Sequence, residues 1–137
     1  MKKFSPIYFL SVMIVFSACI KRDVLSKKDG ASLPPVTSLA LEELDSNKVF
    51  LSWGIPENIP ENILRPLNVY IEVKEEVSSL KSLSIFNVTI PEDTRFEYAI
   101  PDPAKTYHIT VKLNGLVNST DPNFSNNIFS PGQTVIR

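Results

Sequence analysis

The chain has 137 residues, and its 14 basic and 15 acidic residues leave a formal net charge of −1. This length accommodates one domain of ordinary size and a short additional segment. Residues 33–137 carry 13 acids and eight bases, a net charge of −5 with no basic stripe, which argues against nucleic acid as a partner.

The first 18 residues have the pattern of an export signal. Lys2 and Lys3 precede an apolar run at residues 7–16 that only Ser11 interrupts, and small residues follow the run. A secretory signal has this order of positive, apolar and small residues. The run is also shorter than the ~20 apolar residues that a membrane-spanning helix needs. We therefore predict a signal peptide at residues 1–18.

The only cysteine of the chain lies where this signal ends. The segment Phe16-Ser17-Ala18-Cys19 resembles the lipobox of bacterial lipoproteins, with Phe16 in place of the usual Leu. The resemblance implies cleavage before Cys19 and a diacylglycerol on its sulfur, which would tether the protein to a membrane. Ile20 replaces the Asp that retains enteric lipoproteins in the inner membrane, so we expect the outer membrane, on its periplasmic or its surface face. The alternative is an ordinary signal peptide that leaves a free Cys19.

Residues 19–33 are predicted to be the lipidated cysteine and a flexible linker. Residues 20–33 are rich in charge and contain no aromatic residue, so they have no face to bury. A flexible chain of this length has a root-mean-square span of ~20 Å. Its bases either contact anionic headgroups or belong to a solvated spacer.

Residues 34–137 are predicted to form one all-β domain. Short segments alternate apolar and polar residues between Pro-, Asn- and Asp-containing turns, which is the pattern of β-strands. Seven such strands in ~100 residues predict an immunoglobulin-like sandwich. The predicted strands lie at residues 36–42, 49–53, 67–74, 86–90, 96–100 and 107–113, and within 128–137.

Two segments make this fold more specific. Residues 49–53, Val-Phe-Leu-Ser-Trp, resemble strand B of a fibronectin type III domain, which ends on a core Trp. Residues 103–111, Pro-Ala-Lys-Thr-Tyr-His-Ile-Thr-Val, resemble the run into its strand F, where a Tyr hydroxyl ties back to the preceding corner. The resemblance implies structural roles for Trp53 and Tyr107, and it covers almost all of residues 34–137. The sequence departs from the family at Ile100 and across residues 75–84.

No residues are predicted to be catalytic, and no metal or cofactor is expected. The single histidine, His108, lies at an outward position of a predicted strand without a partner implied by spacing. The sequence has no Gly-rich phosphate loop, Cys/His cluster or Ser-centred elbow. These observations predict that the protein is not an enzyme.

The loops at one pole of the predicted sandwich are candidate binding elements. In this fold the B–C, D–E and F–G loops lie together, and here they correspond to residues 54–66, 91–94 and 114–127. Apolar contacts, carboxylates and amides for a protein or glycan partner could come from these loops, although Asn, Asp and Pro are also ordinary turn formers. The candidate contacts are Ile59, Ile63, Asp93, Asn118, Asp121 and Asn123.

The sequence therefore predicts a lipid-anchored, non-enzymatic binding module of the bacterial cell envelope, with an unknown envelope protein or glycan as its partner. One alternative is a small structural subunit that docks onto a larger outer-membrane complex through a sheet face or edge. Another is a carbohydrate-binding accessory lipoprotein. In the predicted fold the tether attaches at the pole of the three loops, which makes the sheet faces and the opposite pole, at residues 101–106, competing surfaces.

Overall fold

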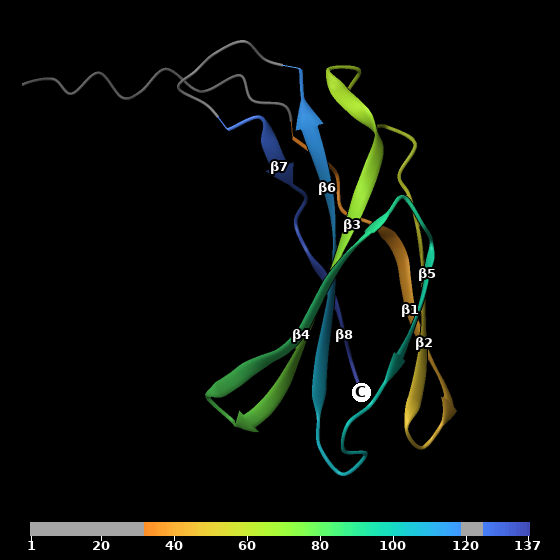
Figure 1. Ribbon diagram of the computed structural model, residues 1–137, viewed down its shortest axis with the longest axis vertical. Helices are drawn as coiled ribbons and strands as arrows, with labels where there is room; N and C mark the ends of the chain where they lie inside the picture. The colour runs from red at the N-terminus through yellow and green to blue at the C-terminus, as the bar shows by residue number, and fades with distance from the viewer. Residues whose placement is uncertain (1–31, 119–124) are drawn as a thin grey trace, which may run out of the picture. The chain divides into compact units, whose positions relative to one another are not determined.

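A computed structural model describes residues 32–118 and 125–137. These residues contain eight β-strands and no helix (Figure 1), and hence no helix that could span a membrane. The strands are β1 (Thr37–Asp45), β2 (Lys48–Gly54), β3 (Ile63–Ser78), β4 (Lys81–Pro91), β5 (Arg95–Ala99), β6 (Tyr107–Val117), β7 (Asn127–Phe129) and β8 (Gln133–Ile136). The predicted signal peptide and Cys19 lie outside the described residues.

The strands form two antiparallel sheets. One sheet has the order β1-β2-β5, and the other has the order β4-β3-β6-β7, with β8 also paired to β6. Since β4 pairs with β3, it extends the second sheet and leaves three strands in the first, unlike the four-stranded A, B, E and D sheet of an immunoglobulin constant domain. The prediction of an all-β immunoglobulin-like sandwich of the fibronectin type III kind is confirmed.

The core lies between the sheets and is built by period-two alternation. On β2 the buried residues are Val49, Leu51 and Trp53, and the neighbours between them are more exposed. The same alternation holds on β3 from Leu67 to Val73 and on β6 from Tyr107 to Leu113. Alternate residues of a strand face opposite sides of its sheet, so this pattern directs one row of side chains into the sandwich.

The core begins one residue before the predicted start of the domain. Leu33 is 1% exposed, within the segment predicted to be linker, and Val36 is fully buried. A Cβ placed on Gly115 of β6 would lie 2.8 Å from Ile63 Cγ2 and 3.7 Å from Leu33 Cδ2, so these side chains meet over that glycine. Any flexible tether therefore ends before Leu33.

The second sheet differs from the predicted strands in two places. The strands expected at residues 67–74 and 86–90 are longer, and they form a hairpin of β3 and β4 that turns at residues 79–80. The last predicted strand is divided into β7 and β8 around Pro131 and Gly132. Proline has no backbone N–H to donate, so an interruption of the ladder is expected there.

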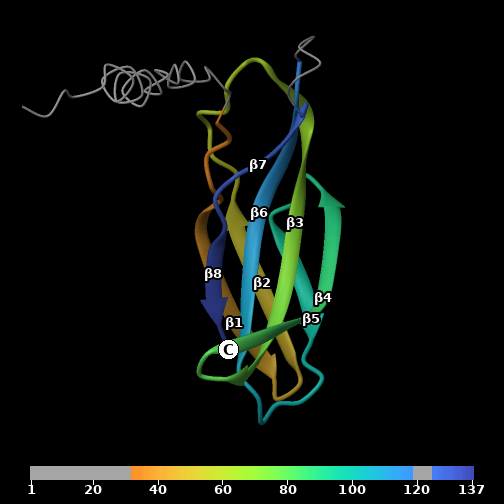
Figure 2. The ribbon, with the colours of Figure 1, turned by 90° about the vertical axis from the view of Figure 1, so that its left-hand side faces the viewer.

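The described chain begins at one pole of the sandwich and ends at the other (Figure 2). Leu33 lies beside the ends of β3 and β6 that carry the predicted B–C and F–G loops. At the opposite pole Arg137 donates from Nη1 to the Pro103 carbonyl (2.9 Å) and from Nη2 to the Ser46 carbonyl (2.8 Å). The described domain is thus entered at the loop pole, as the resemblance implied.

Candidate functional site

The structure buries one of the two isoleucines predicted to contact a partner. Ile63 opens β3, pairs with Val117 of β6 and is only 4% exposed. Its selection as a loop contact is therefore corrected, because the register of β3 against β6 directs its side chain into the core. Ile59 is partly buried and packs against the same core. Neither residue offers a freely exposed apolar side chain.

Asp93, another predicted contact, lies in the turn between β4 and β5 and serves that turn. Its Oδ1 accepts a hydrogen bond from the Thr94 backbone N–H at 2.6 Å. Its backbone carbonyl accepts a hydrogen bond from Trp53 Nε1 at 2.8 Å, and the Trp53 backbone N–H donates to the Thr94 carbonyl at 3.1 Å. The turn and the core tryptophan are therefore joined, which explains Asp93 without a ligand.

Glu92, the neighbour of Asp93, also stabilises this pole. Its Oε1 accepts from Arg65 Nη1 at 2.6 Å, and its Oε2 accepts from the Leu67 backbone N–H at 3.1 Å. The carboxylate thus ties the β4–β5 turn to the start of β3. No local pattern identifies this bond, because its partners are 25 and 27 residues away in the sequence.

The remaining loop candidates contribute little to a site in the described residues. Asn118 is exposed, and its backbone N–H donates to the Asn62 carbonyl at 2.8 Å, which joins the two loops. Asp121 and Asn123 lie outside the described residues. Among residues 32–118 and 125–137, no group of three His, Cys, Asp or Glu side chains is placed to hold a metal ion.

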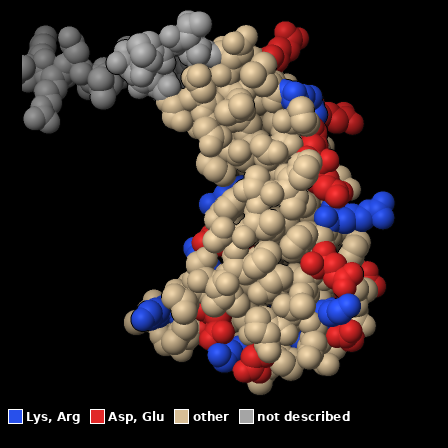
Figure 3. Space-filling view, viewed as in Figure 1, with Lys and Arg blue, Asp and Glu red and all other residues tan. Residues whose placement is uncertain are grey.

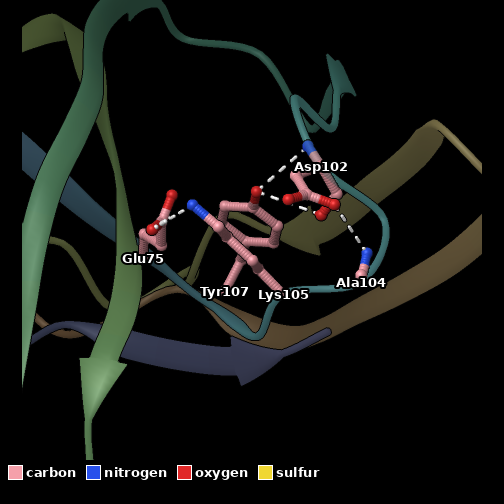
Figure 4. Close-up of polar contacts among 5 residues, drawn as sticks. All are labelled: Glu75, Asp102, Ala104, Lys105 and Tyr107. Atoms are coloured by element: carbon pink, nitrogen blue, oxygen red, sulfur yellow. Dashed lines mark hydrogen bonds and ion pairs between the residues drawn. The ribbon is translucent and has the colours of Figure 1, made fainter.

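Tyr107 forms a tyrosine corner at the opposite pole (Figure 4). The side chain is fully buried, and its hydroxyl accepts from the Asp102 N–H and donates to the Asp102 carbonyl, each at 3.1 Å. Asp102 Oδ1 accepts from the Ala104 N–H at 3.0 Å and closes the loop before β6. These bonds fix the β5–β6 connection and leave no free polar group on the tyrosine for chemistry.

An ion pair lies beside this corner. Lys105 Nζ is 2.7 Å from Glu75 Oε1 (Figure 4), and the hydrogen bond to Glu75 is the main cause that raises the pKa of the lysine. The hydrogen bond and the negative charge of Glu75 each favour the charged form of the lysine. Because the lysine is exposed, the pair is a surface contact.

The β3–β4 hairpin projects from the sandwich (Figures 1 and 3) and carries the largest group of exposed apolar side chains among the described residues. Nine large hydrophobic residues of the described chain are exposed, and four of them lie on the outer part of this hairpin, residues 76–85. Leu80, at its turn, is 98% exposed. Exposed apolar residues that gather on one element are typical of interaction surfaces. The four are Val77, Leu80, Leu83 and Ile85.

Polar residues around the turn of the hairpin border this surface. A shallow hollow there is lined by Glu76, the turn residues 78–82 and His108. His108 Nε2 lies 3.3 Å from Glu76 Oε2, so the single histidine contacts the hairpin from the adjacent strand β6. Apolar side chains bordered by polar ones are the usual composition of a protein-binding patch.

A second, smaller apolar region lies on the outer face of the same sheet near the loop pole. Leu64 and Leu116 are cross-strand partners, 49% and 53% exposed, and Phe129 is 53% exposed. The ring of Phe129 meets that of Tyr70 edge to face, with centroids 6.0 Å apart. This region borders the pole where the described chain begins, whereas the tip of the hairpin lies at the other end.

Comparisons with known proteins give a family and structural neighbours. A family model with the description "Domain of unknown function (DUF4945)" matches residues 19–137. A search of curated proteins finds no match to the chain.

The solved structures similar to the chain include two human fibronectin type III domains. The third fibronectin III domain of the human KIAA0343 protein has a TM-score of 0.49 and 16% identity over 80% of this chain and 87% of that one. The fibronectin type-III domain of human fibronectin type III domain containing protein 3 has a TM-score of 0.42 and 16% identity over 81% of this chain and 90% of that one.

Proposed function

Because the chain belongs to the DUF4945 family, whose description assigns no activity, we propose a function from its sequence and its surfaces. The protein is a lipid-anchored, non-enzymatic interaction module of the bacterial cell envelope. It is held in the outer membrane through Cys19 and binds a partner protein with its β3–β4 hairpin. The observation that carries the proposal is the group of four exposed aliphatic side chains on that hairpin.

The anchor is supported by the sequence before the domain. The apolar run, the small residues and the single cysteine have the order of a lipoprotein signal, and the family match begins at Cys19. A diacylglycerol and a further acyl chain each contribute ~0.8 kcal/mol per buried CH₂, which is enough for stable membrane attachment.

The choice of the hairpin over the loops is supported by burial and hydrogen bonding. Ile63 is buried, Asp93 closes its own turn and Glu92 is paired, so the described loop side chains mostly stabilise the pole. The domain is entered at that same pole, whereas Leu80 is almost fully exposed at the other end. A tethered module presents its distal end to partners most easily, and burial of aliphatic side chains favours a protein partner over a glycan.

Replacing Cys19 with serine tests the anchor. We expect the wild-type protein in the membrane fraction, released by detergent and not by high salt, and Cys19→Ser in the soluble fraction, because serine cannot carry the thioether-linked diacylglycerol. Quantitative immunoblotting of fractionated cells measures the partition, and Ser17→Ala is the control that keeps a small residue in the signal. Retention of Cys19→Ser in membranes after a high-salt wash would show that another element holds the protein.

The double variant Leu80→Ser/Leu83→Ser tests the binding surface. Loss of two aliphatic contacts at the centre of an interface is expected to weaken partner binding by roughly tenfold or more. Recovery of cross-linked partner from detergent-solubilised membranes measures it. The matched control is Leu64→Ser/Leu116→Ser, the same chemical change near the other pole. Equal recovery from both variants would exclude the hairpin as the binding surface.

A further inference from the structure

We infer that the free edge of β4 accepts an extended strand of the partner protein, which adds a strand to the second sheet. The inference deepens the proposed function and rests on it. The backbone of β4 is then the recognition element, and its ligand is an extended polypeptide segment. The docking subunit that the sequence left as an alternative, which would use a sheet face or edge, could bind through this edge as well.

The backbone of β4 is open on one side. The strand is the last in its sheet and pairs only with β3, from Asn68↔Pro91 to Ser78↔Lys81. In residues 32–118 and 125–137, no other backbone hydrogen bond involves residues 81–90. Phe86 contacts Phe96 and Tyr98 of the facing sheet, but through its ring. A row of unpaired N–H and C=O groups is a ready template for another strand.

The sequence of β4 does not protect this edge with charge, and its proline, Pro91, stands only at its end. Its 11 residues carry no charge after Lys81, and the stretch Ser-Leu-Ser-Ile-Phe-Asn-Val-Thr-Ile at residues 82–90 favours strand pairing. The other edges are protected in the ways usual for monomeric proteins. β1 carries Glu42, Glu43 and Asp45, and β5 has five residues including Arg95 and Glu97. β7 and β8 have three and four residues.

A second copy of the chain fits this edge poorly. The β3–β4 register shifts between Val73, opposite Phe86, and Lys74, opposite Ser84, so Ile85 is the extra residue of a bulge. The regular part of β4 thus lies between this bulge and Pro91. If two copies of β4 paired antiparallel about a two-fold axis, with their core-facing side chains on the same side of the joined sheet, the axis would pass at Val88. Only residues 86–90 of each copy would then pair. Such pairing leaves Leu80 and Leu83 uncovered, whereas a strand of another protein can follow the whole edge.

The partner segment can be described by its chemistry. It is an extended segment without charge in its middle, with apolar side chains that cover Leu83 and Ile85. An acidic residue beside Lys81 would complement the charge at that end of the edge. Most of its affinity comes from backbone hydrogen bonds, and its side chains add specificity.

The position of Pro91, which ends β4 opposite Asn68, shows which backbone N–H groups of β4 point to the open side of the sheet. A proline in a strand directs its nitrogen to the free side of the sheet. Strand geometry has a period of two, so the N–H groups of Thr89 and Asn87 face the same free side. Thr89→Pro therefore removes a donor from the open edge and leaves the bonds to β3 intact.

Photo-cross-linking in cells that normally produce the chain tests the inference. The probe is p-benzoylphenylalanine at Asn87, an exposed position on β4, with the same probe at Ala40 on β1 as the positional control. We expect one adduct of defined mass from position 87 and none from position 40. Adding Thr89→Pro should abolish the adduct, and adding Thr89→Val, which keeps the N–H and favours a strand, should preserve it. Circular dichroism and thermal unfolding of the purified variants check that both remain folded.

Each other outcome overturns strand addition. An adduct of twice the mass of the chain identifies a second copy as the occupant. An adduct to lipid, an adduct that survives Thr89→Pro, or no adduct at position 87 excludes pairing at this edge. A further probe at Leu80 separates this failure from failure of the proposed function. An adduct to a partner protein from Leu80 without one from position 87 keeps the hairpin as the binding surface but removes the edge as its means of recognition.

Discussion

Replacing Trp53 with alanine is expected to lower the free energy of unfolding by about 3–5 kcal/mol. Trp53 ends β2, is 5% exposed, and fills the core with the largest side chain it contains. Its Nε1 also donates to the Asp93 carbonyl at 2.8 Å, so truncation leaves a cavity and an acceptor without its donor. Total stabilities of small domains are about 5–15 kcal/mol, so this single change removes a large part of the total.

Trp53→Phe separates the cavity from the hydrogen bond. It keeps an aromatic ring but removes the Nε1 donor, and we expect an intermediate loss of about 1–3 kcal/mol. Urea unfolding followed by far-ultraviolet circular dichroism suits both variants, because the chain has no other tryptophan to report by fluorescence. A loss below about 1 kcal/mol for Trp53→Ala would contradict the placement of this side chain in the core.

Replacing Leu33 with alanine is expected to cost about 2–5 kcal/mol, as for other fully buried leucines. The side chain is 1% exposed and lies with Ile63 and Leu67 over Gly115. Loss of the Leu33 side chain opens a cavity at the loop pole, because the residue of β6 beneath it, Gly115, has no side chain to fill the space. The effect should therefore resemble a core substitution, although the residue lies before the first strand.

The control for Leu33 is Leu64→Ala, the same change at a side chain that is 49% exposed. We expect that variant to change the free energy of unfolding by at most about 0.5 kcal/mol, since exposed substitutions rarely cost more. Urea midpoints at an unchanged m-value give both numbers. Equal urea midpoints for Leu33→Ala and the wild type would contradict the placement of Leu33 in the core and would assign it to the flexible tether.

The strands that the sequence predicted best are those buried on one face. β2 and β6 alternate because one row of side chains enters the core, and the predicted segments 49–53 and 107–113 lie within them. The outer part of the β3–β4 hairpin was not predicted, because both of its faces meet solvent and residues 76–85 show no buried row. Alternation of apolar and polar residues indicates a strand with one buried face, so it is absent where a strand extends beyond the core.

The candidate site was predicted less well, for a related reason. Ile63 and Ile59 are equally apolar in the sequence, and only the pairing of Ile63 with Val117 decides that Ile63 is buried. Glu92 lies next to Asp93 and resembles it, but its carboxylate is paired with a backbone N–H and an arginine of β3. Leu33, an isolated apolar residue before Pro34 and Pro35, gave no periodic signal at all.

The sequence alone determined the all-β class, the inward rows of the main strands, and the positions at which Trp53 and Tyr107 would lie. These properties depend on local alternation and on residue types that few environments accept. Only the tertiary structure decided which loop side chains are already paired and which edge of the sandwich is open. Strands are joined by backbone groups that every residue except proline shares, so the sequence does not specify where pairing ends. The open edge of β4 and the exposed hairpin that carries it became visible only when all eight strands were in place.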